Sequence, residues 1–358
     1  MLIAENHQQQ LVRAETARRS QNYHCPQCHA PVILKRGTTM IAHFAHQPSF
    51  DCASFSEGET AEHLQGKRQL AAWFARSGYR VQLEAPLPAL HQRPDVLVFG
   101  VNQQPLAIEF QCAPLSVQRL AARTTGYREH GYRVWWLLGH PYAKGVTRHG
   151  KAIKFLQFAQ NWGYYIPIWD VTCGRLTLHY QLANVDFKPL RSRQIQFTSQ
   201  VAVQRVWCWQ PSAHVIVSPV TANSEAAIMA GRLGANHQLR QLQLECYQHG
   251  GSLQQLPAWV WSTQVRPPLL RGSGFVWQLA IFFKLRRCPV RMSSSQLRTL
   301  LMTTLRPLLA ANACLWPPAC HSDQLIDGVI KTLVAFDVIR WATDSWQLRP
   351  VQVAWKKH

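Results

Sequence analysis

The first 52 residues of this 358-residue chain include five Cys and His side chains at spacings typical of a zinc site. Cys25 and Cys28 form a Cys-x-x-Cys pair, His43 and His46 follow after fourteen intervening residues, and Cys52 is a fifth candidate. Structural Zn²⁺ takes four Cys or His ligands in a tetrahedron, and a region of about fifty residues builds little core without such a crosslink. A redox-active Cys-x-x-Cys is the alternative, but no helix evidently follows it. The spacing predicts structural zinc on Cys25, Cys28, His43 and His46, with Cys52 as an alternative ligand.

Two acidic residues and a glutamine fall on neighbouring strand-like runs farther along the chain. Asp95 follows Pro94 at the start of the first run, and Glu109 and Gln111 lie on the second. Because side chains alternate along a strand, Glu109 and Gln111 share one face. Two carboxylates can hold Mg²⁺ or Mn²⁺, which neutralises charge on a phosphate and activates water. The order of residues resembles that of PD-(D/E)XK nucleases, with Gln111 in the position of the lysine.

Both carboxylates also have ordinary structural interpretations. An Asp beside a Pro is commonly a turn residue, and a Glu on a strand is commonly solvated. Glu109, however, lies between Ile108 and Phe110 in a run typical of a central strand, and a buried carboxylate needs a partner or a metal ion. We therefore expect Asp95 and Glu109 to hold the cation and Gln111 to orient the water or the phosphate. A glutamine lacks the charge of a lysine, so a binding protein without catalysis is the alternative.

A predicted helix upstream of these strands carries further candidates. Glu59, His63 and Lys67 recur at i, i+4 and i+8, which places them on one helix face. Glu59, Glu62 and His63 are candidates to complete the metal site, and Lys67 is a candidate for the charge that Gln111 lacks. The alternatives are a capping role for Glu59 and a solvated helix surface for Glu62 and His63.

The periodicity around these residues predicts alternating helices and strands. The first helix begins at a Ser56 or Thr60 cap and ends at Gly78. A second helix covers about 116–130 and carries Arg119, Arg123 and Tyr127 at i, i+4 and i+8. Strands are predicted at Met1–Ala4, Leu11–Ala14, 79–84, 94–99, 106–112 and 132–138. This order predicts an α/β fold with a mixed central sheet flanked by helices.

Differences in residue composition along the chain predict three regions. Residues 1–53 form an N-terminal zinc-finger-like region, residues 54–185 the α/β domain, and residues 186–358 a mainly helical C-terminal domain rich in Gln, Leu and Trp. The last region offers tryptophans for stacking on bases, or simply a core that uses Trp.

The composition limits the classes of function. The chain has 38 Lys and Arg against 18 Asp and Glu, a formal charge of +20 that favours polyanions such as nucleic acid. Solubility or an anionic membrane surface are the alternative explanations. The longest apolar stretch, Gly274 to Leu285, is shorter than the about 20 residues of a membrane span, and the N-terminus lacks a signal-peptide pattern. We therefore expect a cytoplasmic protein without a membrane span.

Several unlike motifs occur in the order typical of one family. They are Tyr23-His24-Cys25-Pro26-Gln27-Cys28, His43-Phe44-Ala45-His46, the run from Ser56 to Lys67, Arg93-Pro94-Asp95-Val96-Leu97, Ile108-Glu109-Phe110-Gln111-Cys112 and Trp135-Trp136-Leu137-Leu138-Gly139. Over residues 1–140 the chain resembles the competence protein CoiA family. Members are intracellular bacterial proteins, induced during competence and needed for efficient genetic transformation, with a nuclease-like domain behind a zinc-finger-like N-terminus.

The resemblance implies a restriction-endonuclease-like core and a site made of Asp95, Glu109 and Gln111, with Glu62, His63 and Lys67 from the helix. It also makes Arg119, Arg123 and Tyr127 candidates for contact with DNA phosphates, although a helix-packing role is the alternative. We expect a Mg²⁺- or Mn²⁺-dependent deoxyribonuclease that processes transforming DNA or recombination intermediates, on single-stranded or branched DNA, alongside proteins of the homologous recombination machinery. The alternative is a non-catalytic DNA-binding accessory protein on a nuclease-like scaffold.

Overall fold

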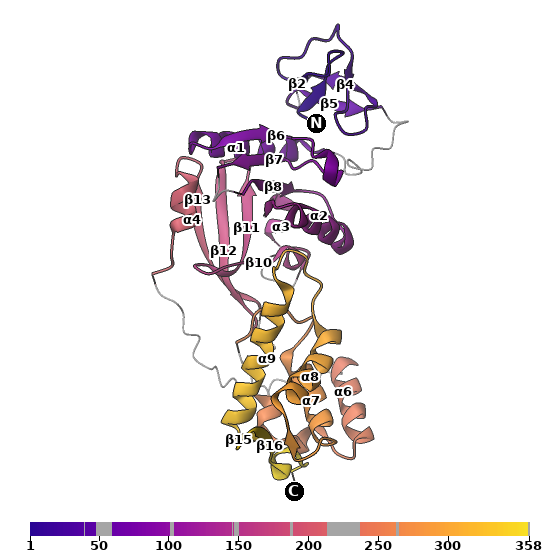
Figure 1. The fold of residues 1–358 in the computed structure, drawn as a ribbon, viewed down its shortest axis with the longest axis vertical. Coiled ribbons are helices and arrows are strands. Elements are labelled where there is room, and N and C mark those ends of the chain that lie inside the picture. Colours follow the sequence, from indigo (N-terminus) through magenta and orange to yellow (C-terminus); the bar gives the residue numbers. More distant parts are fainter. Residues whose placement is uncertain are drawn as a thin grey trace. The chain divides into compact units, whose positions relative to one another are not determined.

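The N-terminal residues form a small antiparallel sheet of their own, in the order β2-β1-β3-β4-β5 (Figure 1). Its strands are β1 (Ile3–Glu5), β2 (Leu11–Arg13), β3 (Tyr23–His24), β4 (Pro31–Lys35) and β5 (His43–His46). The two predicted N-terminal strands are therefore present, but they pair with each other here and do not enter the central sheet. Tyr23, Val32 and Phe44 fill the core under this sheet.

The structure is a computed structural model that describes residues 1–38, 40–47, 59–100, 104–144, 146, 150–186, 189–212, 237–262 and 265–356. The chain folds into two compact units. The first unit contains Met1–Gln181, Ser192–Ser212 and Asn312–Cys314, and the second contains Leu182–Arg191, Ala213–Ala311 and Leu315–His358. Residues 192–212, which lie beyond the boundary proposed at residue 185, thus belong with the α/β part of the chain.

The first unit is built on an eight-stranded mixed sheet in the order β13-β12-β11-β9-β8-β7-β6, with β10 paired to β11. Strands β8, β9 and β11 are parallel to one another, whereas β6, β7 and β8 form an antiparallel meander. The strands are β6 (Arg80–Leu83), β7 (Val96–Phe99), β8 (Leu106–Gln111), β9 (Arg133–Leu138), β10 (Gln157–Ala159), β11 (Gly163–Asp170), β12 (Arg175–Ala183) and β13 (Arg191–Thr198). A mixed α/β architecture is confirmed.

Two helices cover opposite faces of the central strands. The core on the side of helix α1 (Ala61–Arg76) contains Phe74, Val96 and Ile108. The core on the side of helix α2 (Val117–Glu129) contains Leu97 and Tyr127. Neighbouring strand residues 96 and 97 thus face different helices, as the alternation of a strand requires. Thr60 and Ser116 cap the two helices through their side-chain oxygens. Of the two predicted caps for the first helix, Thr60 is confirmed, and Ser56 lies outside the described residues.

The chain adds further elements to this unit after the second helix. They are helix α3 (His140–Ala143), helix α4 (Val203–Cys208) and the 3₁₀ turns η1 (Pro88–Leu90) and η2 (Ile153–Phe155). Helix α4 and strand β13 lie in the region predicted to be a separate helical domain. Trp73 of α1 donates from Nε1 to the carbonyl of Val201 at 2.7 Å, so the segment before α4 packs against helix α1.

The second unit is helical in most of its described length and also contains a three-stranded antiparallel sheet in the order β14-β16-β15. Its helices are α6 (His237–Gln248), α7 (Gly274–Leu285), α8 (Ser294–Leu305) and α9 (Pro318–Ala335), its strands β14 (Arg291–Met292), β15 (Ile339–Ala342) and β16 (Ser345–Leu348), and its 3₁₀ turns η3 (Leu253–Gln255), η4 (Ala258–Trp261), η5 (Arg306–Leu308) and η6 (Pro350–Val353). None of the helices in the described part of the chain combines the length and the apolar character of a membrane span.

Candidate functional site

Asp95 and Glu109 lie at neighbouring ends of strands β7 and β8. The antiparallel register pairs Val96 with Ile108, so the next step of the ladder places Asp95 opposite Glu109. Both residues are buried, with 9% of Asp95 and 1% of Glu109 exposed. Two acids at facing positions of adjacent strands are close enough to influence each other's ionisation. The two predicted carboxylates are therefore brought to one place by the sheet.

Asp95 is held by groups from helix α1 and from strand β8. Its Oδ2 accepts a hydrogen bond from the backbone N of Phe110 at 2.8 Å and lies 3.1 Å from Nε2 of His63. Its Oδ1 lies 3.8 Å from Nζ of Lys67. Burial opposes ionisation of Asp95, but the nearby positive groups of His63, Lys67 and Arg123 outweigh it and lower its pKa to about 2. Asp95 is thus a permanently charged carboxylate.

Glu109 is held from the opposite face of the sheet, by helix α2. Its Oε1 accepts hydrogen bonds from Nη2 of Arg123 at 2.5 Å and from the hydroxyl of Tyr127. Burial raises the pKa of Glu109 strongly and Asp95 raises it further, whereas Arg123 lowers it, and the result is a pKa of about 7. The two neighbouring carboxylates therefore differ widely in acidity, which is common at catalytic sites.

Lys67 occupies the centre of a buried network of charges. Its ammonium group is fully buried and contacts carboxylate oxygens of Glu59, at 2.5 Å, and of Glu84. Burial lowers the pKa of Lys67, but Glu59, Glu84 and Asp95 outweigh it and raise the pKa above its ordinary value. Glu84 also accepts hydrogen bonds from the backbone N of Leu2 and of Ile3, at 2.9 and 3.1 Å, which ties the small sheet to the network.

Sequence reasoning missed Glu84 and proposed that Glu59 helps to complete the metal site, with a capping role as the alternative. The helix periodicity already placed Glu59 and Lys67 on one face, and this signal identifies their pairing. Glu84 ends a predicted strand with no spacing that links it to Lys67. Its backbone has a φ of 48°, in the left-handed region that non-glycine residues rarely adopt. A sequence alone does not reveal such a conformation.

Glu62, Cys112 and Gly139 meet near the carboxyl ends of the parallel strands β8 and β9. Oε1 of Glu62 accepts a hydrogen bond from the backbone N of His140 at 2.6 Å. A Cβ at Gly139 would lie 2.6 Å from Sγ of Cys112 and 2.6 Å from that same oxygen of Glu62, so any larger residue would displace these side chains. Burial, followed by the charges of Glu62 and Asp95, raises the pKa of the Cys112 thiol. Glu62 therefore lies near the cluster but is engaged by the backbone.

The remaining predicted residues differ in their surroundings. Gln111 is 5% exposed, and its Nε2 donates to the carbonyl of Ala113 at 2.8 Å. Arg123 retains 31% side-chain exposure while it pairs with Glu109. Arg119 is exposed on the first turn of α2, where its backbone N bonds to Oγ of Ser116. Of the three candidates for DNA contact, Arg123 therefore lies at the carboxylates and Arg119 on the outer helix surface.

The donor set of the carboxylate pair fits a hard divalent cation. Within the described residues, Oδ1 of Asp95 and Oε2 of Glu109 accept no hydrogen bond. Among those same residues, no three Asp, Glu, His or Cys ligand atoms of this cluster lie within 4.8 Å of one another. Mg²⁺ is commonly held by one or two carboxylates and completes its shell with water and substrate phosphate. Two carboxylates with one open oxygen each match that requirement.

A second cluster lies in the small N-terminal sheet. Ligand atoms of Cys25, Cys28 and His46 lie within 4.8 Å of one another, and Sγ of Cys28 is 3.3 Å from Nε2 of His46. The structure does not bring His43 into this group, since its Nδ1 is bonded to the carbonyl of Ile41 at 2.9 Å. Residues three apart on a strand point to opposite faces, which separates His43 from His46 on β5. Cys52 lies outside the described residues.

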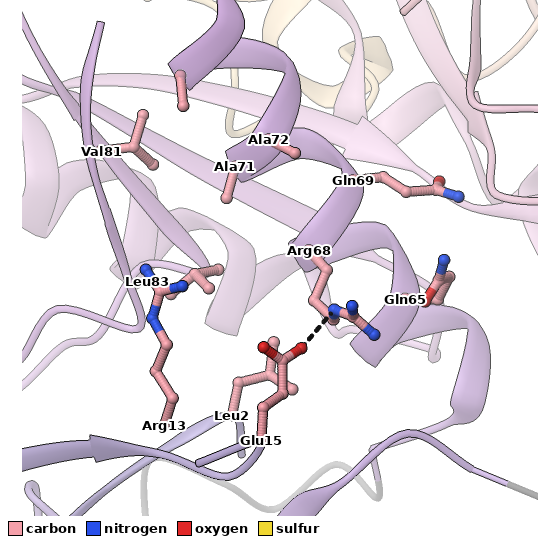
Figure 2. Close-up of a pocket in the computed structure, with 11 residues that line it drawn as sticks. Leu2, Arg13, Glu15, Gln65, Arg68, Gln69, Ala71, Ala72, Val81 and Leu83 are labelled. Carbon is pink, nitrogen blue, oxygen red and sulfur yellow. Dashed lines mark ion pairs between the residues drawn. The ribbon is translucent and has the colours of Figure 1, made fainter.

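A separate pocket of 440 Å³ lies on the other side of helix α1 (Figure 2). Ala71, Ala72 and Val81 line it, and an ion pair between Arg68 and Glu15, at 2.9 Å, crosses its edge. Neither Asp95 nor Glu109 is among its lining residues. The charged cluster around Asp95 and Glu109 is therefore distinct from this pocket.

Family models and a curated protein match parts of this chain. Residues 59–173 match the family model "Competence protein CoiA, nuclease-like domain", and residues 5–55 match "Competence protein CoiA, N-terminal domain". The curated "Competence protein CoiA" of Bacillus subtilis (strain 168) is 35% identical over 118 residues, which cover 33% of this chain and 31% of that protein. The match thus spans about a third of the relative. No solved structure matches the chain.

Proposed function

The chain belongs, through its first 173 residues, to the competence protein CoiA family, and we propose that it acts on DNA during genetic transformation as a metal-dependent nuclease. The observation that carries the proposal is the pair of buried carboxylates, Asp95 and Glu109, at facing positions of β7 and β8. Transforming DNA or a recombination intermediate is the substrate that a competence protein with this site would process.

In the proposed site, Asp95 and Glu109 would hold Mg²⁺ or Mn²⁺. Such a cation neutralises charge on a scissile phosphate and makes a bound water more acidic. Asp95 is charged at every working pH, because its pKa is about 2. Arg123 and Tyr127 fix the position of Glu109, and their hydrogen bonds leave one of its oxygens for the cation.

The fold proposed for residues 54–185 is that of a PD-(D/E)XK nuclease. Strands β7 and β8 carry the Pro-Asp and Glu-x-Gln residues, and helix α1 brings Lys67 within 3.8 Å of Asp95. We propose that Lys67 supplies the positive charge that Gln111 cannot, and that Gln111 positions a water or a phosphate oxygen. Structural zinc on Cys25, Cys28 and His46 would hold the N-terminal sheet.

A non-catalytic role in DNA binding is the second candidate, and Gln111 favours it. Its amide donates to the carbonyl of Ala113, so this donor is already used within the chain. The formal charge of +20 supports binding to nucleic acid by a nuclease and by a non-catalytic protein alike. A cleavage assay is therefore needed to distinguish the two functions.

The test compares cleavage and binding by the full chain. Purified protein is incubated with single-stranded, duplex and branched DNA, with Mg²⁺ or Mn²⁺, and the products are resolved on denaturing gels. Asp95→Ala and Glu109→Ala should each abolish cleavage and leave the affinity for DNA nearly unchanged. Glu129→Ala removes an exposed acid at the end of α2 and should cleave like the wild type.

Each outcome decides between the candidates. Cleavage retained in both carboxylate variants would exclude Asp95 and Glu109 as the metal site. Binding without cleavage on every substrate and with both metals would favour the non-catalytic role.

A further inference from the structure

The second unit, from helix α7 to its end, follows the connectivity of a winged helix. The order is helix α7, strand β14, helices α8 and α9, and the hairpin of β15 and β16. Strand β14 pairs with β16, which gives the sheet order β14-β16-β15. In this arrangement α9 is the third helix and the two-residue turn at Thr343 and Asp344 is the tip of the wing. These residues lie outside the segments that match the family models.

The wing hairpin carries two tryptophans at facing positions. Trp341 pairs with Trp346 across the hairpin, with ring centroids 5.0 Å apart and planes at 73°. Met292 of β14 lies opposite Trp346 in the same row and is buried against the helices. The row therefore begins in the core and ends at Trp341, which is 54% exposed. An exposed indole at the end of an apolar row is a surface ready for stacking.

A hollow of 280 Å³ lies between this hairpin and helices α8 and α9. Ser294, Arg298, Asp327, Ile330, Lys331 and Trp346 line it. Trp346 is held in place because its Nε1 donates to Oγ of Ser294 at 3.2 Å. One wall is thus an indole of fixed orientation, and two cationic side chains, Arg298 and Lys331, stand at the other.

The charge around this hollow favours a nucleic acid. The run from residue 246 to 322, which includes β14 and α8, contains eight Lys and Arg and no Asp or Glu. The acids nearest the hollow are Asp323 and Asp327 on α9, and both pair with Arg298. Asp344 lies at the tip of the hairpin.

The same acids favour single-stranded over duplex DNA. A third helix that enters a major groove passes between two phosphate backbones, and exposed Asp323 on α9 would be repelled there. Unpaired bases, in contrast, stack on exposed indoles while a few cations contact one backbone. From the hairpin, the hollow and the charge we propose that the second unit binds single-stranded DNA through Trp341, Trp346 and Lys331.

This site goes beyond the proposed nuclease, because it needs neither the carboxylates nor a divalent cation. Binding is therefore measured on the full chain without added Mg²⁺ or Mn²⁺, where the proposed metal-dependent cleavage does not proceed. The probes are a fluorescein-labelled oligothymidylate and a labelled blunt duplex of the same length. Fluorescence anisotropy at several NaCl concentrations gives the Kd and its dependence on salt.

Two variants separate stacking from charge. Trp341→Ala should raise the Kd for the oligothymidylate about tenfold at every salt concentration, since stacking contributes about 1–3 kcal/mol per base and 1.4 kcal/mol is tenfold. Trp341→Phe should recover part of that loss. Lys331→Ala should instead lower the slope of log Kd against log salt by about 0.7, the value for one phosphate contact on a single strand.

The matched control is Trp316→Ala, which removes an indole of similar exposure, 60%, that lies outside the hairpin. It should bind like the wild type. The proposal is overturned if Trp341→Ala keeps the wild-type Kd, if Trp316→Ala weakens binding equally, or if the chain prefers duplex. If the nuclease assay shows no cleavage but the binding effects are observed, the proposed nuclease is wrong and the single-strand site is supported. The two proposals can therefore fail separately.

Discussion

Removal of the buried charge of Lys67 should destabilise the first unit more than any surface change. Lys67→Met keeps most of the volume of the side chain and removes the ammonium group. Glu59 and Glu84 would then be buried without their shared partner. An unpaired buried charge lowers the free energy of unfolding far more than the loss of a surface ion pair does. The substitution therefore tests how strongly Lys67 stabilises the two buried carboxylates.

The magnitude follows from the pKa of Glu84. Burial alone would raise that pKa, but Lys67 and Arg93 lower it from 4.5 to about 2. A shift of this size corresponds to about 3 kcal/mol of stability, on the scale of 1.36 kcal/mol for each pKa unit. Because the folded pKa is depressed, this stability is present above about pH 4.5 and is lost as the pH falls through about 2. Removal of one partner of a buried pair costs about 3–5 kcal/mol, in agreement.

The assay is urea-induced unfolding of the full chain, followed by circular dichroism, at about pH 7 and about pH 3. Lys67→Met should lose about 3–5 kcal/mol at the higher pH and clearly less at the lower one, where the carboxylates of the variant become neutral. Adding Glu84→Gln should restore part of the loss. Arg68→Met, the next residue on the helix, breaks a half-exposed pair with Glu15 and should cost less than about 1 kcal/mol. A Lys67→Met penalty that is small, or equal at both pH values, would refute the reasoning.

Three further outcomes follow from the geometry. Cys25→Ser should purify without zinc, whereas His43→Ala should retain it, as measured by plasma mass spectrometry of the dialysed chain. Since the pKa of Glu109 is raised to about 7, the stability contributed by its neutral form is complete below about pH 4.5 and is lost as the pH rises through about 7. In EDTA the wild type should show this loss in urea unfolding and Glu109→Gln should not. Gly66→Ala should cost about 1–3 kcal/mol or more in the same measurement, because the new Cβ would overlap the ring of Phe110; unchanged stability would contradict that packing.

The central strands and the carboxylate pair could be predicted from the sequence because their signals are local. Alternation along 106–112 identifies the faces of β8, and the few residues between the two strands in the sequence favour an antiparallel pair with β7. The position of Asp95 opposite Glu109 follows from these two facts. The identity of the partners of each carboxylate does not, since Arg123 and Tyr127 come from a helix whose docking is fixed only by the assembled core.

Other features depended on information that short-range patterns do not carry. His-x-x-His suggests a shared metal ligand set, but on the strand Phe44 lies in the core between two histidines that face apart. Strand β13 lies in a region predicted to be helical, because Ile195 and Phe197 are its only apolar residues, a pattern expected for an edge strand. Its assignment requires knowledge that β12 is available as a neighbour.

The attachment of residues 192–212 to the first unit limits how the chain can be divided in the laboratory. The matched family segment ends at residue 173. However, the indole N–H of Trp73 donates a hydrogen bond to the carbonyl of Val201, and Oγ of Ser77 accepts one from the backbone N of Val203. An expression fragment that ends at residue 173 would leave the buried indole N–H of Trp73 without its acceptor and would expose the side of α1 that these residues cover. Shortened versions of this protein should therefore keep the polypeptide at least through Ser212.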